Sequence, residues 1–299
     1  MKLQIFTPQA IHELGNRENQ EDAIYPSKDA ANTDSRVFVV CDGMGGMDKG
    51  EVASDAVCKT LGRVAETILQ TTGTFSDEDF EHCMTAAFDA LDAADVDNEA
   101  SMGTTMTFLC IHEGGCLVSH IGDSRIYHLR PSLGPQRGVL FRSRDHSLVQ
   151  QMYEAGDICY NDMAKSPKKN VILKAMQPHQ PERTIPSMAH IGTVWPGDYF
   201  LLCTDGMLEH MDDGQIMALL ADNSLTLEQK TQQLIEMTSG NADNHSAYLI
   251  QVEKVQRNAI EDANIVDDEI AHRIRNKVLN DTHRDTIWHF DDAVPMPEF

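Results

Sequence analysis

The spacing of apolar positions changes several times along the 299-residue chain. From Gly50 to Gln70, apolar residues recur every three or four positions, which predicts an amphipathic helix. Residues 77–95 show the same spacing and follow Ser76, a residue typical of helix N-termini. Short apolar runs then predict strands at 105–112, 116–121, 125–130 and 139–143. Because these strands lie so close together in the sequence, they favour antiparallel hairpins over parallel crossovers.

The two ends of this block add further elements. Strands are expected at 3–12 and 37–41, at 199–203 and at 247–252, with helices near 213–220 and 227–238. Residues 157–191 show no regular pattern. Strands and helices that come in blocks indicate an α+β fold. We expect a β-sandwich of two mainly antiparallel sheets flanked by helices, in four layers α-β-β-α.

Two of the apolar runs end in the same dipeptide. Residues 37–41 are followed by Asp42-Gly43, and residues 199–204 are followed by Asp205-Gly206. An aspartate at the mouth of a buried strand can face a cleft. Gathering several carboxylates away from water is costly unless a cation compensates them. The repeated pattern therefore predicts a site for a hard metal ion.

The composition restricts the partners and the compartment. A formal net charge of -23 argues against nucleic acid, because no basic excess exists to neutralise phosphates. No apolar stretch reaches membrane-spanning length, so no membrane partner is expected. The seven cysteines form no CxxC pair and several lie inside apolar runs. This usage is typical of a reducing compartment and predicts a cytoplasmic protein.

The candidate motifs are weak when they are taken singly. Aspartate or asparagine beside glycine is an ordinary turn, and each motif alone favours a structural role. The glycine-rich stretch 42–46 also lacks the Lys-Ser/Thr of a phosphate-binding loop, which excludes nucleotide binding there.

Taken together and in order, the motifs resemble the metal-dependent Ser/Thr protein phosphatases of the type-2C (PPM) family. The resemblance covers about residues 10–252. The matching segments are Arg17…Asn19-Gln20-Glu21-Asp22, Asp42-Gly43-Met44-Gly45-Gly46, Gly122-Asp123-Ser124-Arg125, Asp205-Gly206 and Asp243-Asn244.

This resemblance implies a site for two Mn²⁺ or Mg²⁺ ions, with a third, weaker ion beside them. Both metals prefer oxygen ligands and retain several waters, which suits a carboxylate cluster. An activated water would attack the phosphomonoester of phosphoserine or phosphothreonine directly. The implied ligands are Asp42 as the bridge, the Gly43 carbonyl, Glu21 and Asp22 partly through water, Asp205 and Asp243 at one metal, and Asp123 at the third.

The resemblance also assigns roles to residues that bind no metal. Arg17 is expected to grip the phosphate, because a guanidinium can contact two oxygens at once. Arg125 is expected to be structural, and Asp145 and His146 to cap the following helix. Met44 stands where some family members have a histidine that can protonate the leaving oxygen, so a metal-bound water would take that role here.

Phosphoserine and phosphothreonine proteins are the implied substrates, and a cognate Ser/Thr kinase is a possible partner. Residues 157–191 correspond to a variable flap beside the active site, and Gln177 there replaces a glycine usual in the family. Lys165, Lys168 and Lys169 could steer phosphoproteins towards the site. A plain solvated loop explains these lysines equally well.

Other functional classes fit less well. None of the seven cysteines is followed at the sixth position by arginine, which excludes a cysteine-dependent phosphatase. A Gly-x-Ser-x-Gly hydrolase motif is absent. An inactive, phosphoprotein-binding scaffold of the same fold is the remaining alternative. The catalytic domain is expected to span 1–252, followed by an extension, 253–299, which docks a partner, covers the site or has no role.

Overall fold

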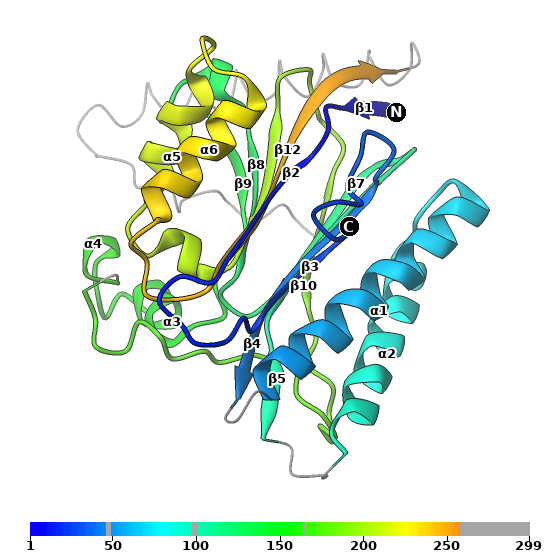
Figure 1. Ribbon diagram of the computed structural model, residues 1–299, viewed down its shortest axis with the longest axis vertical. Coiled ribbons are helices and arrows are strands. Elements are labelled where there is room, and N and C mark those ends of the chain that lie inside the picture. Colours follow the sequence, from blue (N-terminus) through cyan, green and yellow to red (C-terminus); the bar gives the residue numbers. More distant parts are fainter. Residues whose placement is uncertain (46–48, 97–100, 164, 258–299) are drawn as a thin grey trace. The chain divides into compact units, whose positions relative to one another are not determined.

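Two antiparallel sheets form the centre of the computed structural model, which describes residues 1–45, 49–96, 101–163 and 165–257 (Figure 1). The first sheet has the order β1 (Lys2–Ile5), β12 (His245–Gln256), β11 (Tyr199–Cys203), β8 (Arg125–Leu129) and β9 (Val139–Arg142), and β2 (Gln9–Glu13) also pairs with β12. The second has the order β10 (Ser187–Ile191), β7 (Gly115–Ile121), β6 (Met106–His112), β4 (Val37–Gly45) and β3 (Asp22–Tyr25), and β5 (Met102–Thr104) pairs with β4.

Helices cover the outer face of each sheet. Helices α1 (Lys49–Thr72) and α2 (Asp77–Ala94) pack on the second sheet through an apolar cluster that includes Leu61 and Phe108. Helices α5 (Asp213–Ala221) and α6 (Leu227–Thr238) pack on the first. A third cluster fills the space between the sheets. The expected four layers, α-β-β-α, are confirmed.

The predicted start of α2 is also confirmed. Ser76 is its N-cap: the Ser76 hydroxyl accepts from the Asp79 amide, and the Asp79 carboxylate accepts from the Ser76 amide. The N–H of Gly73 donates to the Leu69 carbonyl and Gly73 has a φ of +73°, the backbone that ends α1. Two further helices, α3 (Leu148–Glu154) and α4 (Tyr160–Met163), follow β9.

Several strand predictions needed correction. The strand expected at 3–12 is two strands, β1 and β2, which pair with successive parts of β12. Pro8 lies in the break between them, where its missing N–H costs no pairing. Strands β3 and β5 were not predicted because they are short and carry polar or glycine positions. Residues 157–191, expected to be irregular, contain α4 and β10.

Strand β12 continues to Gln256, past the predicted end at Val252, and its last residues pair with β1. Most of the predicted extension, residues 258–299, lies outside the described residues, so its role stays a prediction. No helix in the described part of the chain is long and apolar enough to cross a membrane.

Candidate functional site

The site begins where β3 and β4 meet, because the pairing register places Asp22 directly opposite Asp42. Strand β4 does not end at residue 41, before Asp42, as the sequence predicted. It continues to Gly45 and exchanges β6 for β5 as its partner. The Asp42 carbonyl accepts from the Thr105 N–H (2.8 Å) and the Asp42 N–H donates to the Thr105 hydroxyl (3.0 Å). Thr105 therefore holds both the N–H and the carbonyl of Asp42.

Both Asp-Gly dipeptides require their glycine. A Cβ on Gly43 would clash with the carbonyl oxygens of Gly50 and Glu21, and a Cβ on Gly206 would clash with the carbonyl oxygen of Asn244. The chain thus approaches each aspartate closely on its C-terminal side. This close approach explains in physical terms why the two apolar runs end in the same pair of residues.

The first sheet brings Asp205 and Asp243 to the same place. Asp205 follows β11 and Asp243 precedes β12, and these two strands are neighbours. The Thr204 hydroxyl donates to Asp22 Oδ2 (3.0 Å), a bond that joins the two sheets at this end of the sandwich. Four aspartates from distant parts of the sequence therefore meet across the sheet interface.

Asp123 joins them from the turn between β7 and β8. His146 holds this turn at two points: the Gly122 N–H donates to His146 Nδ1 (3.2 Å), and the His146 N–H donates to the Gly122 carbonyl (2.9 Å). The hydroxyls of Ser124 and Thr105 lie 2.7 Å apart. Thr105 thus connects the Asp123 turn to the backbone of Asp42.

Burial, with mutual repulsion second to it, governs the charge state of these carboxyl groups. Burial, together with the charges of Asp205 and Asp243, raises the pKa of Asp22 to about 7, although hydrogen bonds from Ser246 and Thr204 oppose the rise. Burial and the charges of Asp205 and Asp145 raise the pKa of Asp123 to about 7. Burial and the surrounding aspartates raise the pKa of Asp42 well above its usual value. The pKa of Asp205 is shifted in the same direction.

Two carboxylate oxygens in this group are unsatisfied. Oδ1 of Asp123 and Oδ1 of Asp205 are buried and make no hydrogen bond with any described residue. A buried acceptor without a donor is costly, and a cation can remove that cost for several oxygens at once. The donor set consists of hard oxygens, which fits Mg²⁺ or Mn²⁺.

The carboxylate group fits a metal site that is completed by water and by backbone oxygen. Within the described ranges, no group of three or more His, Cys, Asp or Glu side chains could hold a metal ion by itself. The aspartates are near enough to raise one another's pKa values, but they do not form a closed cage among the described residues. Ions that retain water and accept a backbone carbonyl, such as that of Gly43, need no such cage.

Arg17 lies at the edge of this carboxylate group, where Nη2 donates to Asp243 Oδ2 over 2.8 Å. Its side chain remains 51% exposed, so it can still contact a ligand.

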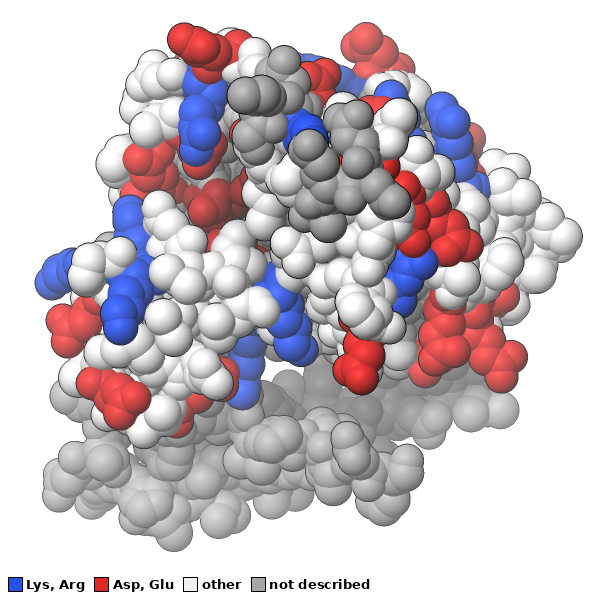
Figure 2. All heavy atoms as spheres, turned by 90° about the horizontal axis from the view of Figure 1, so that it is seen from below, with Lys and Arg blue, Asp and Glu red and all other residues white. Residues whose placement is uncertain are grey.

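Glu21 contributes to the site through its backbone: its N–H donates to Asn244 Oδ1 (2.8 Å) and its carbonyl accepts from the Gly43 N–H (3.0 Å). Figure 2 shows acidic side chains lining a hollow in the face seen from below, with basic side chains around it.

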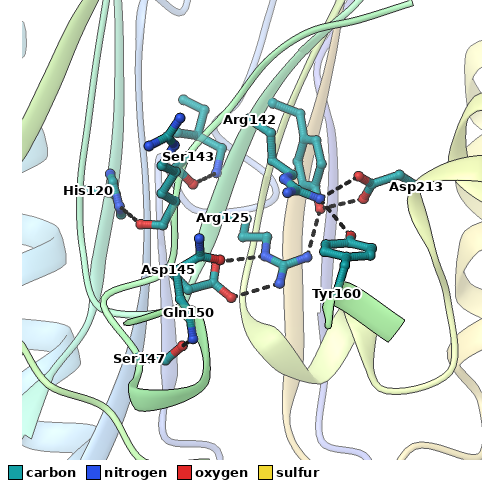
Figure 3. A network of polar contacts seen from close by, with 12 residues as sticks. His120, Arg125, Arg142, Ser143, Asp145, Ser147, Gln150, Tyr160 and Asp213 are labelled. Atoms are coloured by element: carbon teal, nitrogen blue, oxygen red, sulfur yellow. Dashed lines mark hydrogen bonds and ion pairs between the residues drawn. The ribbon is translucent and has the colours of Figure 1, made fainter. Parts of the chain in front are cut away.

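The expectation that Asp145 and His146 cap the next helix is wrong. The N-cap of α3 is Ser147, whose hydroxyl accepts from the Gln150 N–H. Asp145 instead forms a bidentate pair with Arg125, with both N···O distances at 2.7 Å (Figure 3). Because this pair is largely buried, the guanidinium requires the carboxylate. The structural role expected for Arg125 agrees with this geometry.

The pair belongs to a wider network (Figure 3). Arg125 donates to the Tyr127 hydroxyl (3.3 Å), which donates to Asp213 at the start of α5 (3.0 Å). Arg142 donates to Asp213 (2.8 Å) and to the hydroxyl of Tyr160 in α4 (2.9 Å). The turn that carries Asp123 is thereby fixed to elements on the far side of the first sheet.

Sequence reasoning gave no role to several positioning residues. Asn244 is one: its Nδ2 donates to the carbonyls of Leu14 (2.8 Å) and Asn19 (3.0 Å) and so holds the loop that carries Arg17. Its place next to Asp243 was the only indication in the sequence. Thr105 and Thr204 also position the aspartates, and nothing in their spacing predicted those contacts; His146, for which a helix cap was expected, holds Gly122 instead.

Two hollows lie away from the aspartates. One, of about 390 Å³, is lined by Tyr199 and Lys230 among others. Lys230 is explained without a ligand, because its Nζ donates to the Leu220 carbonyl at the C-terminal end of α5 and to the Tyr199 hydroxyl. The other, of about 460 Å³, lies beside Tyr25 and Arg63. Neither hollow includes a predicted metal ligand.

Comparisons with known proteins agree with this geometry. Residues 12–246 match the family model described as protein phosphatase 2C. The chain is 26% identical over 252 residues to the serine/threonine phosphatase stp of Listeria monocytogenes, covering 81% of this chain and 93% of that protein. It is 29% identical over 220 residues to the protein phosphatase PhpP of Streptococcus pneumoniae, covering 72% and 85%.

Solved structures show the same relationship. The serine/threonine phosphatase PstP/Ppp of Mycobacterium tuberculosis superposes with a TM-score of 0.68 at 28% identity, covering 83% of this chain and 99% of that one. The catalytic domain of PstP in complex with two manganese ions gives a TM-score of 0.65 at 28% identity, covering 84% and 99%.

The fold and the carboxylate site thus define a class, the metal-dependent protein phosphatases that act on phosphoserine and phosphothreonine. Within that class, the chain belongs to the protein phosphatase 2C family. It is a hydrolase, and its substrates are phosphoproteins.

Proposed function

We propose that this chain removes phosphate from serine and threonine side chains of proteins by using two Mn²⁺ or Mg²⁺ ions held by Asp22, Asp42, Asp205 and Asp243. The convergence of aspartates with raised pKa values and two unsatisfied buried oxygens carries this proposal. Bound divalent cations supply charge neutralisation and acidify water, the chemistry that phosphomonoester hydrolysis needs.

The protein's own contribution is the placement of the donors. Asp42 is central, since Asp22, Asp205, Asp123 and Asp243 all act on its charge. The Gly43 carbonyl and the Glu21 side chain are the further ligands that we propose. Asp123, on its own turn, suits the third and weaker ion.

Arg17 is proposed to bind the substrate phosphate. Its guanidinium is held by Asp243 at the edge of the site and keeps half of its surface exposed. A planar guanidinium that makes one bond to a carboxylate still has donors for phosphate oxygens. Met44, in β4, cannot donate a proton, so we propose that water protonates the leaving oxygen.

Hydrolysis of p-nitrophenyl phosphate with Mn²⁺, with and without EDTA, tests the metal requirement. Release of phosphate from phosphoserine, phosphothreonine and phosphotyrosine peptides tests the substrate class. We expect Mn²⁺-dependent turnover that EDTA abolishes, with the phosphoserine and phosphothreonine peptides preferred. Absence of turnover in a protein whose circular dichroism spectrum is that of the folded state would favour the inactive scaffold.

A cognate Ser/Thr kinase as partner and a cytoplasmic location remain proposals. If such a kinase exists, the enzyme should remove phosphate from its autophosphorylated form, and failure to do so would count against the pairing. The role of the C-terminal extension can be tested by truncation after Arg257 rather than after Val252, because β12 continues to Gln256. Unchanged activity and partner binding would leave the extension without a role in either.

A further inference from the structure

Residues 165–176, here called the basic segment, differ from the rest of this acidic chain. The segment contains Lys165, Lys168, Lys169 and Lys174, and no Asp or Glu occurs between Asp162 and Glu182. All four lysines are exposed. None forms an ion pair within the part of the chain that the structure describes.

The basic segment is tied to the turn that carries Asp123. The Leu173 N–H donates to the His146 carbonyl over 2.7 Å, and His146 is bonded to Gly122 through both its backbone and its ring. Beside this contact, the Leu148 N–H donates to the Val171 carbonyl (2.8 Å). The middle of the segment is therefore fixed to one side of the carboxylate site.

The end of the segment is tied to the strand that carries Asp42. Met176 and Thr104 exchange two backbone hydrogen bonds, each 2.9 Å long. Thr104 pairs with Gly43 in the β4–β5 ladder, and its hydroxyl donates to the Asp42 carbonyl (2.9 Å). Lys174 lies between the two anchors, and its charge contributes to lowering the pKa of the His146 ring, after burial and the neighbouring His120. Residues 171–176 thus follow the rim of the site as a fixed edge, and Lys165, Lys168 and Lys169 come directly before them in the sequence.

This fixed edge also exposes apolar side chains. Val171 is 42% and Leu173 is 48% exposed, although the backbone on both sides of Leu173 is hydrogen-bonded. A partner that covers these side chains removes apolar surface from water without first having to order the segment. Apolar contacts next to unpaired lysines fit a polypeptide better than they fit a small anion.

Resting on the proposed phosphatase function, we infer that the basic segment is a docking surface for the polypeptide around the phosphorylated residue. It selects phosphoproteins with Asp or Glu beside the phosphoserine or phosphothreonine. Charge complementarity supports this choice, because four exposed lysines in one short segment beside the site attract an acidic chain.

Two phosphothreonine peptides test the inference, identical except that one has three Glu and the other three Gln next to the phosphothreonine. The rate of phosphate release by the full-length protein with Mn²⁺ gives kcat/KM for each. We expect the Glu peptide to be preferred about 10-fold at low ionic strength, a preference that falls as salt screens the charges. Equal values for the two peptides at low salt would overturn the inference.

The variant Lys165→Gln/Lys168→Gln/Lys169→Gln/Lys174→Gln should bring the ratio of the two kcat/KM values close to one. A matched control removes four exposed lysines elsewhere, with the substitutions Lys2→Gln, Lys28→Gln, Lys59→Gln and Lys254→Gln, and should leave the ratio unchanged. If the first variant does not fold, Lys168→Gln/Lys169→Gln should still lower the ratio by about half. A ratio that persists without the segment's lysines contradicts the docking surface.

The apolar part is tested by Leu173→Ser, with Leu133→Ser, another exposed leucine, as control. We expect KM to rise several-fold for both peptides in Leu173→Ser while kcat changes little, and neither to change in the control. An unchanged KM would contradict the apolar contact. Turnover of p-nitrophenyl phosphate distinguishes failure of the docking surface from failure of the proposed phosphatase function. If the wild type hydrolyses it but treats both peptides alike, only the docking surface is wrong; if it hydrolyses none of the three, the proposed function fails as well.

Discussion

Two places in this molecule remove aspartate from water, and they do so in opposite ways. Asp198 is fully buried beside the first sheet, where its carboxylate accepts from Arg130 Nε (2.7 Å) and Nη2 (2.8 Å) and from the Trp195 N–H (2.8 Å) and pairs with His128. At the candidate metal site, the unsatisfied Oδ1 atoms of Asp123 and Asp205 have no such donors among the described residues.

The pKa values move in opposite directions as a result. Burial by itself would raise the pKa of Asp198, but the bonds from Arg130 and His128 lower it. Burial together with neighbouring carboxylates raises the pKa of Asp22, Asp42, Asp123 and Asp205. A buried aspartate whose cation comes from the chain is structural. A group of buried aspartates without one indicates an ion from outside.

The largest expected effect is on catalysis. Asp42→Asn keeps the shape of the side chain and removes the central charge. We expect kcat/KM to fall about 10³-fold, because the metal ions then stabilise the transition state by several kcal/mol less. Because asparagine cannot ionise and so adds no repulsion to the buried carboxyl groups, the metal-free variant should melt at the same temperature as the wild type or higher. Phosphopeptide kinetics and thermal melts in EDTA check both statements, and a strongly destabilised metal-free Asp42→Asn would contradict the comparison.

Asp198→Asn should have the opposite effects: it should lower stability and leave metal binding nearly unchanged. It leaves Arg130 buried beside a neutral partner, and we expect the free energy of unfolding to fall by about 3 kcal/mol, measured in urea. The Mn²⁺ affinity of the folded protein should stay within a factor of about two of the wild type, since no metal ligand changes. A large loss of Mn²⁺ affinity with unchanged stability would reverse the roles assigned to the two regions.

The stability of the metal-free protein should depend on pH in a definite direction. The pKa values of Asp22 and Asp123 are about 7 in the folded state, well above the ordinary value of aspartate in the unfolded chain. The folded state therefore binds more protons, and its extra stability is complete at low pH and is lost as the pH rises through 7. In EDTA, we expect each of these two carboxyl groups to lose about 2 kcal/mol of its stabilisation between pH 5.5 and pH 8.

Saturating Mn²⁺ should remove most of that pH dependence, because the ions then compensate the charges in place of protons. Urea unfolding at a series of pH values, with and without Mn²⁺, measures it. Asp198→Asn should retain the slope of the wild type, and Asp42→Asn should reduce it. A metal-free protein whose free energy of unfolding increases towards pH 8 would show that these carboxyl groups do not hold protons in the folded state.

The smallest effect concerns Asp22, which is intermediate between Asp198, whose donors include an arginine, and the aspartates that have unsatisfied oxygens. Asp22 is buried like Asp198, but its donors are hydroxyls, including Thr204 at 3.0 Å. Thr204→Val should destabilise the protein by about 1 kcal/mol and weaken Mn²⁺ binding about 10-fold. Thr107→Val is the control, since the buried Thr107 hydroxyl donates to the Val40 carbonyl instead (3.0 Å). Equal Mn²⁺ affinities in the two variants would deny Thr204 a positioning role.

Much of the fold could be predicted because its signals are local. The three-four spacing of 50–70 and 77–95 is a property of each helix alone, and the hairpins of β6 to β9 have short connections. Strand β3 could not be predicted, because its four residues are a strand only through pairing with β4. The break at Pro8 likewise depends on how β12 is shared by two partners.

The candidate site shows the same division. The aspartates beside glycine could be found from the sequence, because each Asp-Gly follows an apolar run. Asp145 pairs with Arg125, 20 positions away, and His146 is hydrogen-bonded to Gly122, 24 positions away. Only the fold determines such contacts. Asp145 and His146 come just before a helix in the sequence, so we predicted that they cap it, and that prediction was wrong. The assignment of individual metal ligands stays a prediction.

The central claim is that the aspartates of the site hold protons when no metal is present and exchange them for cations. Calorimetric titration of Mn²⁺ at pH 6.5, in buffers that differ in ionisation enthalpy, counts the protons released on binding. We predict that the wild type releases about one proton or more, that Asp42→Asn releases fewer, and that release by the wild type declines towards pH 8.5. Tight Mn²⁺ binding at pH 6.5 without any proton release would contradict the account.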